Sequence, residues 1–321
     1  MFMQILKLLR VKNLLIIVFT QYLMRYAVIF PMLESKGYVT QFSGFNFFLL
    51  VLTTVLLAAA GYVINDYFDT GTDLLNRPDT VVVGKSITRR NAMTIHLVLN
   101  IVGVVLGFYI SLQIHLWKLV YIYILITGLL WFYSSSYKKM FLVGNIIVAL
   151  LTAMVPLMTV LYEIPALNQK YSEVLLMIGQ NFYDIFFWVA GFSIFAFITT
   201  LTREIIKDAE DFEGDNAYGS RSMPVVAGIR ITKIVTIGLT LITIALILFT
   251  YFFYVSIPGN PDYISIAYIS VLLILPLFIL AYYIVKAKDK KEWKKTGNLL
   301  KLIMLFGVAY AFINWLGYYY Y

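Results

Sequence analysis

Two acidic clusters, far apart in this 321-residue sequence, contain side chains that could bind a metal ion. The first lies at positions 65–73 and the second at positions 207–215, and each follows a long apolar stretch. Carboxylates are costly beside lipid unless they bind a cation or face a watery cavity. Mg2+ prefers oxygen ligands and commonly joins one or two carboxylates to the phosphates of a substrate. The clusters therefore predict a magnesium site that binds a phosphorylated substrate.

The spacing within the clusters places most of these oxygens on one side of a helix. Asn65, Asp69 and Asp73 are four residues apart, and so are Asp211 and Asp215. Side chains at this spacing lie above one another on a helix surface. Two such stripes that face each other across a cavity could hold one or more Mg2+ ions. The predicted metal ligands are Asn65, Asp66, Asp69, Asp73, Asp208, Asp211 and Asp215, with Asp66 on a neighbouring face and Asp208 one turn before Asp211.

Basic residues near the clusters could neutralise the charge that remains on a metal-bound diphosphate. The candidates are Arg77, Lys85, Lys138, Arg203 and Lys207. If the C–O bond to the diphosphate breaks, the leaving group gains negative charge. Metal, lysine and arginine stabilise that charge more in the transition state than in the ground state. The other fragment would be an allylic carbocation, which aromatic faces can stabilise, and 17% of the residues are aromatic.

The composition predicts the helices that must position these residues. Hydrophobic residues form 61% of the chain and charged residues only 13%, against roughly 25% in an ordinary soluble domain, and the mean hydropathy is +0.83. Apolar stretches of roughly 20 residues occur near 14–33, 45–64, 92–113, 117–135, 141–162, 185–202, 231–254, 264–285 and 298–318. They lack the period-2 alternation of a barrel strand. We therefore expect an all-α bundle of about nine transmembrane helices around a central cavity, as a single domain over residues 1–321.

The distribution of basic residues predicts the orientation of these helices. Lysine and arginine gather on alternate connections, whereas the other side keeps only Lys36, Lys118 and Lys170. By the positive-inside rule, the N-terminus and both acidic clusters face the cytoplasm. The concentration of lysine and arginine on one side also accounts for the formal net charge of +8, so this charge need not indicate binding to nucleic acid. The first apolar stretch is too long for a cleaved signal peptide, and a chain without cysteine offers no thiolate or disulfide chemistry.

The motifs resemble those of the UbiA superfamily of intramembrane prenyltransferases. That family pairs an N-D-x-x-D-x-x-x-D motif after its second helix with a D-x-x-x-D motif after its sixth. Here positions 65–73 and 211–215 match, and each follows the expected span. Three further stretches are similar to elements of the family. They are Asn-Arg-Pro-Asp at 76–79, Arg-Val-Lys-Asn at 10–13 and Tyr-Ser-Ser-Ser-Tyr-Lys at 133–138. The last of these is offset from the strict Y-x-x-x-K spacing of the family. The resemblance covers essentially the whole chain.

The resemblance implies a Mg2+-dependent transfer of a prenyl group from a polyprenyl diphosphate to an acceptor. Residues 203–215 look most like the geranylgeranylglyceryl-phosphate geranylgeranyltransferase branch, which makes ether-lipid precursors. The implied acceptor is therefore a glycerol phosphate lipid precursor. The implied catalytic residues are Asp69, Asp73, Asp211, Asp215 and Lys138, and the implied substrate-binding residues are Arg77, Lys207, Arg203, Arg10 and Asn13, the last two near the acceptor.

Several alternatives stay open at the level of sequence. Branches of the superfamily that form quinones share the same core, so the acceptor could instead be aromatic, such as 4-hydroxybenzoate or dihydroxynaphthoate. Intramembrane acids also mark secondary transporters, although those acids lie near the bilayer midplane and not at helix ends. Arg25, inside the first span, is either a substrate contact or half of a structural ion pair. Membrane lipids are expected partners in every case.

Overall fold

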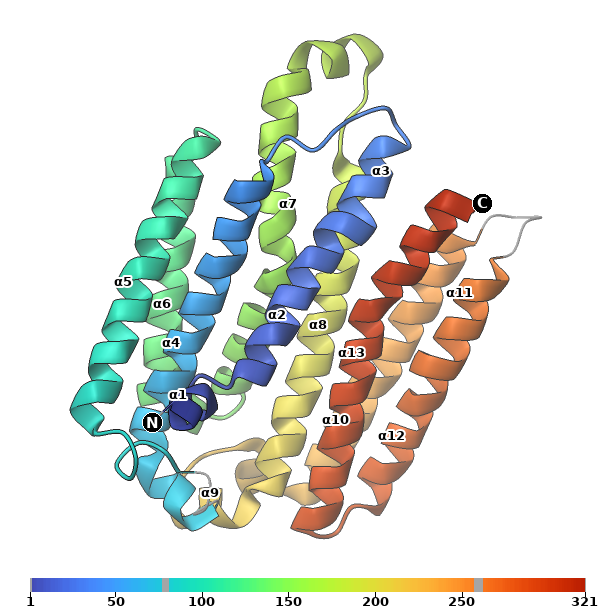
Figure 1. The fold of residues 1–321 in the computed structure, drawn as a ribbon. Helices are drawn as coiled ribbons and strands as arrows, with labels where there is room; N and C mark the ends of the chain where they lie inside the picture. The colour runs from blue at the N-terminus through green and yellow to red at the C-terminus, as the bar shows by residue number, and fades with distance from the viewer. Residues whose placement is uncertain (1, 77–80, 257–261, 321) are drawn as a thin grey trace.

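The computed structural model describes residues 2–76, 81–256 and 262–320 and is almost entirely helical over these ranges (Figure 1). Nine helical stretches in the described residues are long and apolar enough to cross a membrane. They are Val11–Glu34, Gly44–Gly71, Arg89–Gln113, Trp117–Ser135, Val143–Met177, Tyr183–Glu210, Met223–Val255, Tyr263–Lys286 and Lys290–Gly317. The predicted fold class, an all-α membrane bundle, is confirmed.

The individual elements subdivide these spans. In chain order the α-helices are α1 (Phe2–Leu8), α2 (Val11–Leu23), α3 (Phe30–Glu34), α4 (Gly44–Asn76), α5 (Arg89–Gln113), α6 (Val120–Ser135), α7 (Val143–Ile178), α8 (Tyr183–Glu210), α9 (Phe212–Ala217), α10 (Met223–Thr250), α11 (Tyr263–Tyr268), α12 (Leu275–Lys286) and α13 (Lys290–Tyr320). Shorter elements join them, namely the π-helical turns η1 (Met24–Ile29), η5 (Tyr251–Val255) and η6 (Ile269–Ile274), and the 3-10 turns η3 (Trp117–Leu119) and η4 (Tyr137–Lys139).

Several helices are longer than the apolar stretches that predict them. Helix α4 continues to Asn76, α8 continues to Glu210, and α13 already begins at Lys290. A hydropathy window marks only the apolar part of a helix, whereas backbone hydrogen bonding continues into the polar region beyond it. As a result the first acidic cluster lies on α4 itself and not in a loop.

Helix α8 is the central element of the packing, because it packs against α7, α10 and α13. Helix α4 packs in turn against α5 and α6. One close approach depends on a glycine, since a Cβ atom on Gly307 of α13 would collide with the ring of Phe195 on α8. Helix α4, which carries the first acidic cluster, and α8, where the second begins, thus each pack against several neighbouring helices.

Helices α1 and α9, the ends of α4 and α8, and the α12–α13 connection all lie at one end of the bundle (Figure 1). We call this end the acid end. Helix α3 and the last turns of α13 lie at the opposite end. Both acidic clusters therefore belong to the same end of the molecule, as the sequence predicts.

Candidate functional site

The first acidic cluster occupies the last turns of α4. Asn65, Asp66 and Asp69 are helical residues of α4, and Asp73 belongs to the same helix, although its side chain is not described. Arg77 lies outside the described residues. Carboxylates near the C-terminus of a helix oppose the helix dipole and so are unfavourable for the helix itself. Their presence there indicates a purpose other than helix stability.

The second cluster differs from the predicted stripe on one continuous helix. Helix α8 ends at Glu210, Asp211 precedes α9 with φ −96° and ψ 13°, and Asp215 lies in α9. The cluster therefore spans two consecutive helices and not one continuous helix, whereas the expectation that Asp208, Asp211 and Asp215 share one face stays a prediction. Aspartate competes with helical hydrogen bonding, and Gly214 lowers helix propensity. The amide of Asp215 still donates to the carbonyl oxygen of Asp211 at 3.0 Å, so the two residues stay adjacent.

The two clusters meet at the acid end although they are far apart in sequence. The Tyr218 hydroxyl, just after α9, donates to the carbonyl oxygen of Gly71 in α4 at 3.0 Å. Burial raises the pKa of the Asp215 carboxyl, and the negative charges of Asp211 and of Asp69 raise that pKa further, while Lys207 opposes the shift. Carboxylates from α4 and from the α8–α9 segment thus repel one another across the junction. A cation bound between them would remove that repulsion.

Two cations from other parts of the chain pair with the acids of α4. Lys138, in η4, forms an ion pair with Asp69. Arg10, at the α1–α2 junction, places Nη2 2.6 Å from Oδ1 of Asp66, and its guanidinium carbon lies 5.1 Å from the centre of the Tyr62 ring. The structure therefore brings predicted residues Lys138 and Arg10 to the cluster. Asn13, also predicted, is exposed on the first turn of α2.

The end of α8 contributes a further group of charges. Nη1 of Arg203 lies 2.5 Å from Oε1 of Glu204, and Nζ of Lys207 lies 3.9 Å from its Oε2. Asn145 of α7 donates to Oδ2 of Asp208 at 2.8 Å. The sequence analysis did not assign roles to Glu204 or Asn145. A carboxylate inside an apolar span is a usable signal, so Glu204 could have been found, whereas nothing in the sequence marks Asn145.

The donor set fits Mg2+, although the described residues do not form a closed metal cage. Among them, no three aspartate, glutamate, histidine or cysteine residues lie close enough together to hold a metal ion, and the side chain of Asp73 is not in that set. Oδ1 of Asn65 is buried and has no hydrogen-bond partner in the described part of the chain. A buried acceptor of this kind normally has a partner. Carboxylate and amide oxygens around an unpaired acceptor are the chemistry that Mg2+ prefers.

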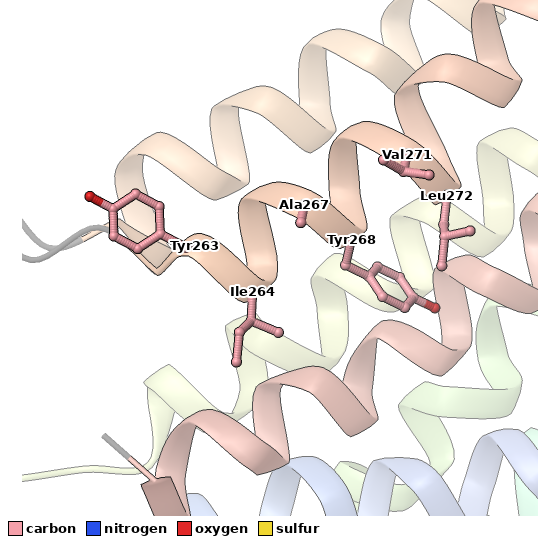
Figure 2. A pocket seen from close by; sticks show the side chains of 6 residues that line it. All are labelled: Tyr263, Ile264, Ala267, Tyr268, Val271 and Leu272. Atoms are coloured by element: carbon pink, nitrogen blue, oxygen red, sulfur yellow. The ribbon is translucent and has the colours of Figure 1, made fainter.

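One hollow, away from the acid end, has no charged side chain in its lining. It is a shallow apolar depression beside α11 and η6, lined by Tyr263, Ile264, Ala267, Tyr268, Val271 and Leu272 (Figure 2). The Tyr268 hydroxyl donates to the carbonyl oxygen of Phe306 on α13 at 2.8 Å and so serves helix packing. The site at the acid end remains the candidate for catalysis.

Comparison with known proteins identifies the family. Residues 32–307 match the sequence model of the UbiA prenyltransferase family. A digeranylgeranylglyceryl phosphate synthase from Methanobrevibacter smithii is 30% identical over 264 residues, which is 82% of this chain and 85% of that protein. A solved structure described as a digeranylgeranylglyceryl phosphate synthase in membranes has a TM-score of 0.64 at 22% identity, covering 97% of this chain and 99% of that one.

A third similar protein was solved with ligands. It is a UbiA homologue from Archaeoglobus fulgidus bound to GPP and Mg2+, with a TM-score of 0.52 at 17% identity, covering 97% of this chain and 99% of that one. At such identities the solved structures establish the fold, while the family match covers most of the chain. That match decides between an enzyme and a secondary transporter in favour of the enzyme. This chain therefore belongs to the UbiA prenyltransferase family, and it is a prenyltransferase.

Proposed function

We propose that this protein transfers a prenyl group, in a Mg2+-dependent reaction, from a polyprenyl diphosphate to a glycerol phosphate ether-lipid precursor of the geranylgeranylglyceryl phosphate type. The observation that carries the proposal is the meeting of acids from α4 and from the α8–α9 segment, with Lys138 and Arg10 beside them. Relatives named digeranylgeranylglyceryl phosphate synthase support the choice of acceptor. The A. fulgidus homologue bound to GPP and Mg2+ supports the choice of donor and metal.

In this proposal the side-chain oxygens of both acidic clusters bind the same metal site. Asn65, Asp69, Asp73, Asp211 and Asp215 would hold Mg2+, with Asp66 and Asp208 next to them. When bound, Mg2+ would supply positive charge beside the diphosphate. Lys138, which pairs with Asp69, would contact phosphate oxygens as well. These positive groups would stabilise the charge that develops on the leaving diphosphate as the C–O bond breaks.

The bond-forming step needs an acceptor hydroxyl close to the allylic carbon. The C–O bond to diphosphate breaks with its electron pair on the diphosphate oxygen, and the acceptor oxygen then bonds the allylic carbon and releases its proton. Reacting atoms must approach within about 3–3.5 Å for an efficient reaction. The acceptor headgroup therefore has to bind at the acid end, where the diphosphate binds. The aromatic rings of Tyr67 and Phe68, next to the acids of α4, and of Trp131 on α6 contact one another.

We also propose that the acid end faces the cytoplasm and that residues 1–321 form one functional unit embedded in membrane lipid. The basic residues of the alternate connections support this orientation through the positive-inside rule. Helix α1 and helix α9 lie at the same end of the bundle, which agrees with a cytoplasmic N-terminus and a cytoplasmic site (Figure 1).

The test is prenyl transfer by the purified protein in detergent with Mg2+ and labelled geranylgeranyl diphosphate. The acceptors offered are geranylgeranylglyceryl phosphate, 4-hydroxybenzoate and dihydroxynaphthoate. We expect a product with the first acceptor that requires Mg2+, disappears with EDTA, and is lost in Asp69→Ala and Asp211→Ala. Transfer only to an aromatic acceptor would replace the proposed substrate. Transfer that persists in EDTA and in both variants would reject the proposed site.

A further inference from the structure

The connection between α12 and α13, at the acid end of the bundle, carries a surplus of positive charge (Figure 1). Residues 286–295 contain six lysines and two acids, a surplus of four positive charges, and all six lysines are exposed. Both acids are engaged by the backbone where α13 begins. Oδ1 of Asp289 accepts from the amide of Glu292 at 2.8 Å, and Oε2 of Glu292 accepts from the amide of Lys288 at 2.6 Å.

The lysines of this connection contact aromatic rings and not acids. Nζ of Lys286 lies 5.9 Å from the centre of the Tyr282 ring, and Nζ of Lys295 lies 4.4 Å from the centre of the Tyr283 ring. In the part of the chain that the structure describes, no ion pair joins an acid to Lys286, Lys288, Lys291, Lys294 or Lys295. Their charges are therefore open to an anion from outside the protein.

Helix α13 turns its lysines away from the bundle. Lys291, Lys294 and Lys295 are three and four residues apart, so they share one face of the helix, and all three are exposed. Trp293 and Thr296, on another face, are buried. Positive charge in the first turn of a helix opposes the helix dipole, so Lys291 does not serve the stability of α13. We call Lys286, Lys291, Lys294 and Lys295 the basic corner.

The basic corner has a fixed position at the end of α12. Helix α12 packs against both α10 and α13. Nζ of Lys233, on α10, donates to the carbonyl oxygen of Val285 in the last turn of α12 at 2.8 Å. The contact of Lys295 with Tyr283 joins α13 to the same turns of α12. The lysines thus stand on three packed helices and not on a long loop.

An exposed apolar stripe on α12 leads to the basic corner. Leu275, Phe278, Tyr282 and Lys286 follow one another at intervals of three or four residues, which places them on one side of the helix. The first three are 53%, 53% and 58% exposed. An apolar stripe that ends in lysines matches a ligand with a hydrocarbon chain and an anionic head. A nucleic acid or an acidic soluble protein would match the lysines and leave the stripe without a partner.

We propose that the basic corner binds the headgroup of an anionic membrane phospholipid, whose chain lies along the exposed stripe of α12. Lysines at the end of a membrane span attract anionic lipids, and each lysine near the surface strengthens binding about fivefold. Tyrosine at the same level suits the interface between headgroups and chains. This inference goes beyond prenyl transfer, because it depends neither on the acceptor nor on Mg2+.

The test is native mass spectrometry of the full-length protein in neutral detergent with equal amounts of phosphatidylglycerol and phosphatidylcholine of the same chain length. We expect the protein to retain phosphatidylglycerol preferentially. In Lys286→Gln/Lys294→Gln/Lys295→Gln this preference should fall about tenfold or more, and the corresponding triple arginine variant should keep it. Equal retention of both lipids by the parent protein would overturn the inference.

The matched control is Lys36→Gln/Lys118→Gln/Lys170→Gln, which removes three lysines from the other side of the molecule. It should keep the preference for phosphatidylglycerol, and an equal loss in the control would show that net charge and not the basic corner attracts the lipid. The single variant Lys294→Gln, at an exposed position, guards against misfolding of the triple variant. We expect about a fivefold weaker preference from it, and no change would count against the inference.

Competitors distinguish a lipid from other anions. An excess of inorganic phosphate or of an oligonucleotide should leave phosphatidylglycerol bound, because neither occupies the apolar stripe. Phosphatidylglycerol with short chains should bind more weakly than the long-chain lipid for the same reason. Displacement by inorganic phosphate would indicate a site for free anions, and displacement by the oligonucleotide would indicate a nucleic-acid surface. Either result, or equal binding of short and long chains, would overturn the inference.

These measurements are independent of prenyl transfer. The basic corner contains none of the residues proposed to bind metal or substrate, so the triple glutamine variant should keep the transfer rate of the parent protein in neutral detergent. If no acceptor is prenylated at all, the proposed function fails, yet the preference for phosphatidylglycerol still decides whether the basic corner binds an anionic lipid.

Discussion

Both ends of the helical bundle bury charged side chains, but the partners of those side chains differ. Away from the acid end, Glu163 of α7 accepts hydrogen bonds from the amides of Gln41 and Phe42 at 2.5 and 3.2 Å. Its Oε2 lies 3.6 Å from Nη1 of Arg25. Arg25 in turn donates to the carbonyl oxygen of Phe42 at 2.5 Å, and its guanidinium carbon lies 4.5 Å from the centre of the Phe47 ring. Every interaction here joins one part of the chain to another.

At the acid end, Asp69 and Asp66 pair with Lys138 and Arg10, but carboxylates from different elements also lie near one another. Oδ1 of Asn65 has no partner among the described residues, and the Asp215 carboxylate is repelled by those of Asp211 and Asp69. Buried polar groups that satisfy one another stabilise a fold, whereas groups left unsatisfied or in mutual repulsion point to a missing ligand. The difference assigns Arg25 to structure, which was one of its two readings from sequence, and it supports the proposal that the acids bind metal and substrate.

The largest effect on stability should come from breaking the buried Arg25–Glu163 ion pair. In Arg25→Met, Glu163 keeps its two amide donors but loses its cation, and an uncompensated buried charge costs about 3–5 kcal/mol of stability. Thermal unfolding in detergent measures the loss. The double variant Arg25→Met/Glu163→Gln should recover much of it, because neither charge remains. A fully stable Arg25→Met protein, or a folded one that has lost prenyl transfer, would contradict the structural role.

Asp69→Asn tests the opposite end and should act on the rate and not on stability. Loss of one group that stabilises developing charge costs about 10²–10³-fold in rate, so we expect transfer to fall by that amount. The melting temperature should change little, because Asp69 and its partner Lys138 are part-exposed at 19% and 14%. Asp184→Asn, at the exposed far end of α8, is the matched control. A loss of stability as large as that of Arg25→Met would remove the contrast between the two ends.

Asn145→Ala should have an intermediate effect, because Asn145 acts through Asp208. Removal of a residue that orients a metal ligand typically costs about 10–100-fold in metal affinity or activity. Mg2+ titration of transfer activity measures the shift. Gln169→Ala is the control on the same helix, since the Gln169 amide donates to the carbonyl oxygen of Ile114 at 2.7 Å, away from the acids. An unchanged Mg2+ requirement in Asn145→Ala would place Asp208 outside the metal site.

The smallest effect is expected at an exposed ion pair. Lys36 and Asp184 lie 2.5 Å apart with side chains 36% and 40% exposed. Solvent screening limits such pairs to about 1 kcal/mol or less, so Lys36→Gln should leave both unfolding temperature and prenyl transfer close to those of the parent protein. A loss of stability as large as that of Arg25→Met would show that solvent exposure does not weaken the Lys36–Asp184 pair relative to the buried Arg25–Glu163 pair.

The sequence predicted the spans more completely than the site. All nine apolar stretches correspond to membrane-length helices in the described residues. The two acidic motifs were found at the correct helix ends, but the helix break at Asp211 was not anticipated. Asp73 and Arg77, both expected at the site, stay predictions, because the structure describes neither side chain.

The pairings could not be read from the sequence, since they join residues far apart along the chain. Lys138 is 69 positions from Asp69, and Asn145 is 63 positions from Asp208. Arg25 meets Glu163 only because α7 packs against η1. No periodicity or spacing rule relates such residues, so the sequence left Arg25 with two readings.

The sequence by itself determined that this chain lies in a membrane and that it holds dense acids at helix ends. Those properties are local, because about 20 apolar residues suffice for a span and neighbouring residues form each motif. The tertiary structure alone decided which charges meet. Helix packing brings α4, α8–α9, η4 and the α1–α2 junction together at the acid end, and it places Glu163 beside Arg25. Charge interactions depend on distance in space, and only the packed bundle sets those distances.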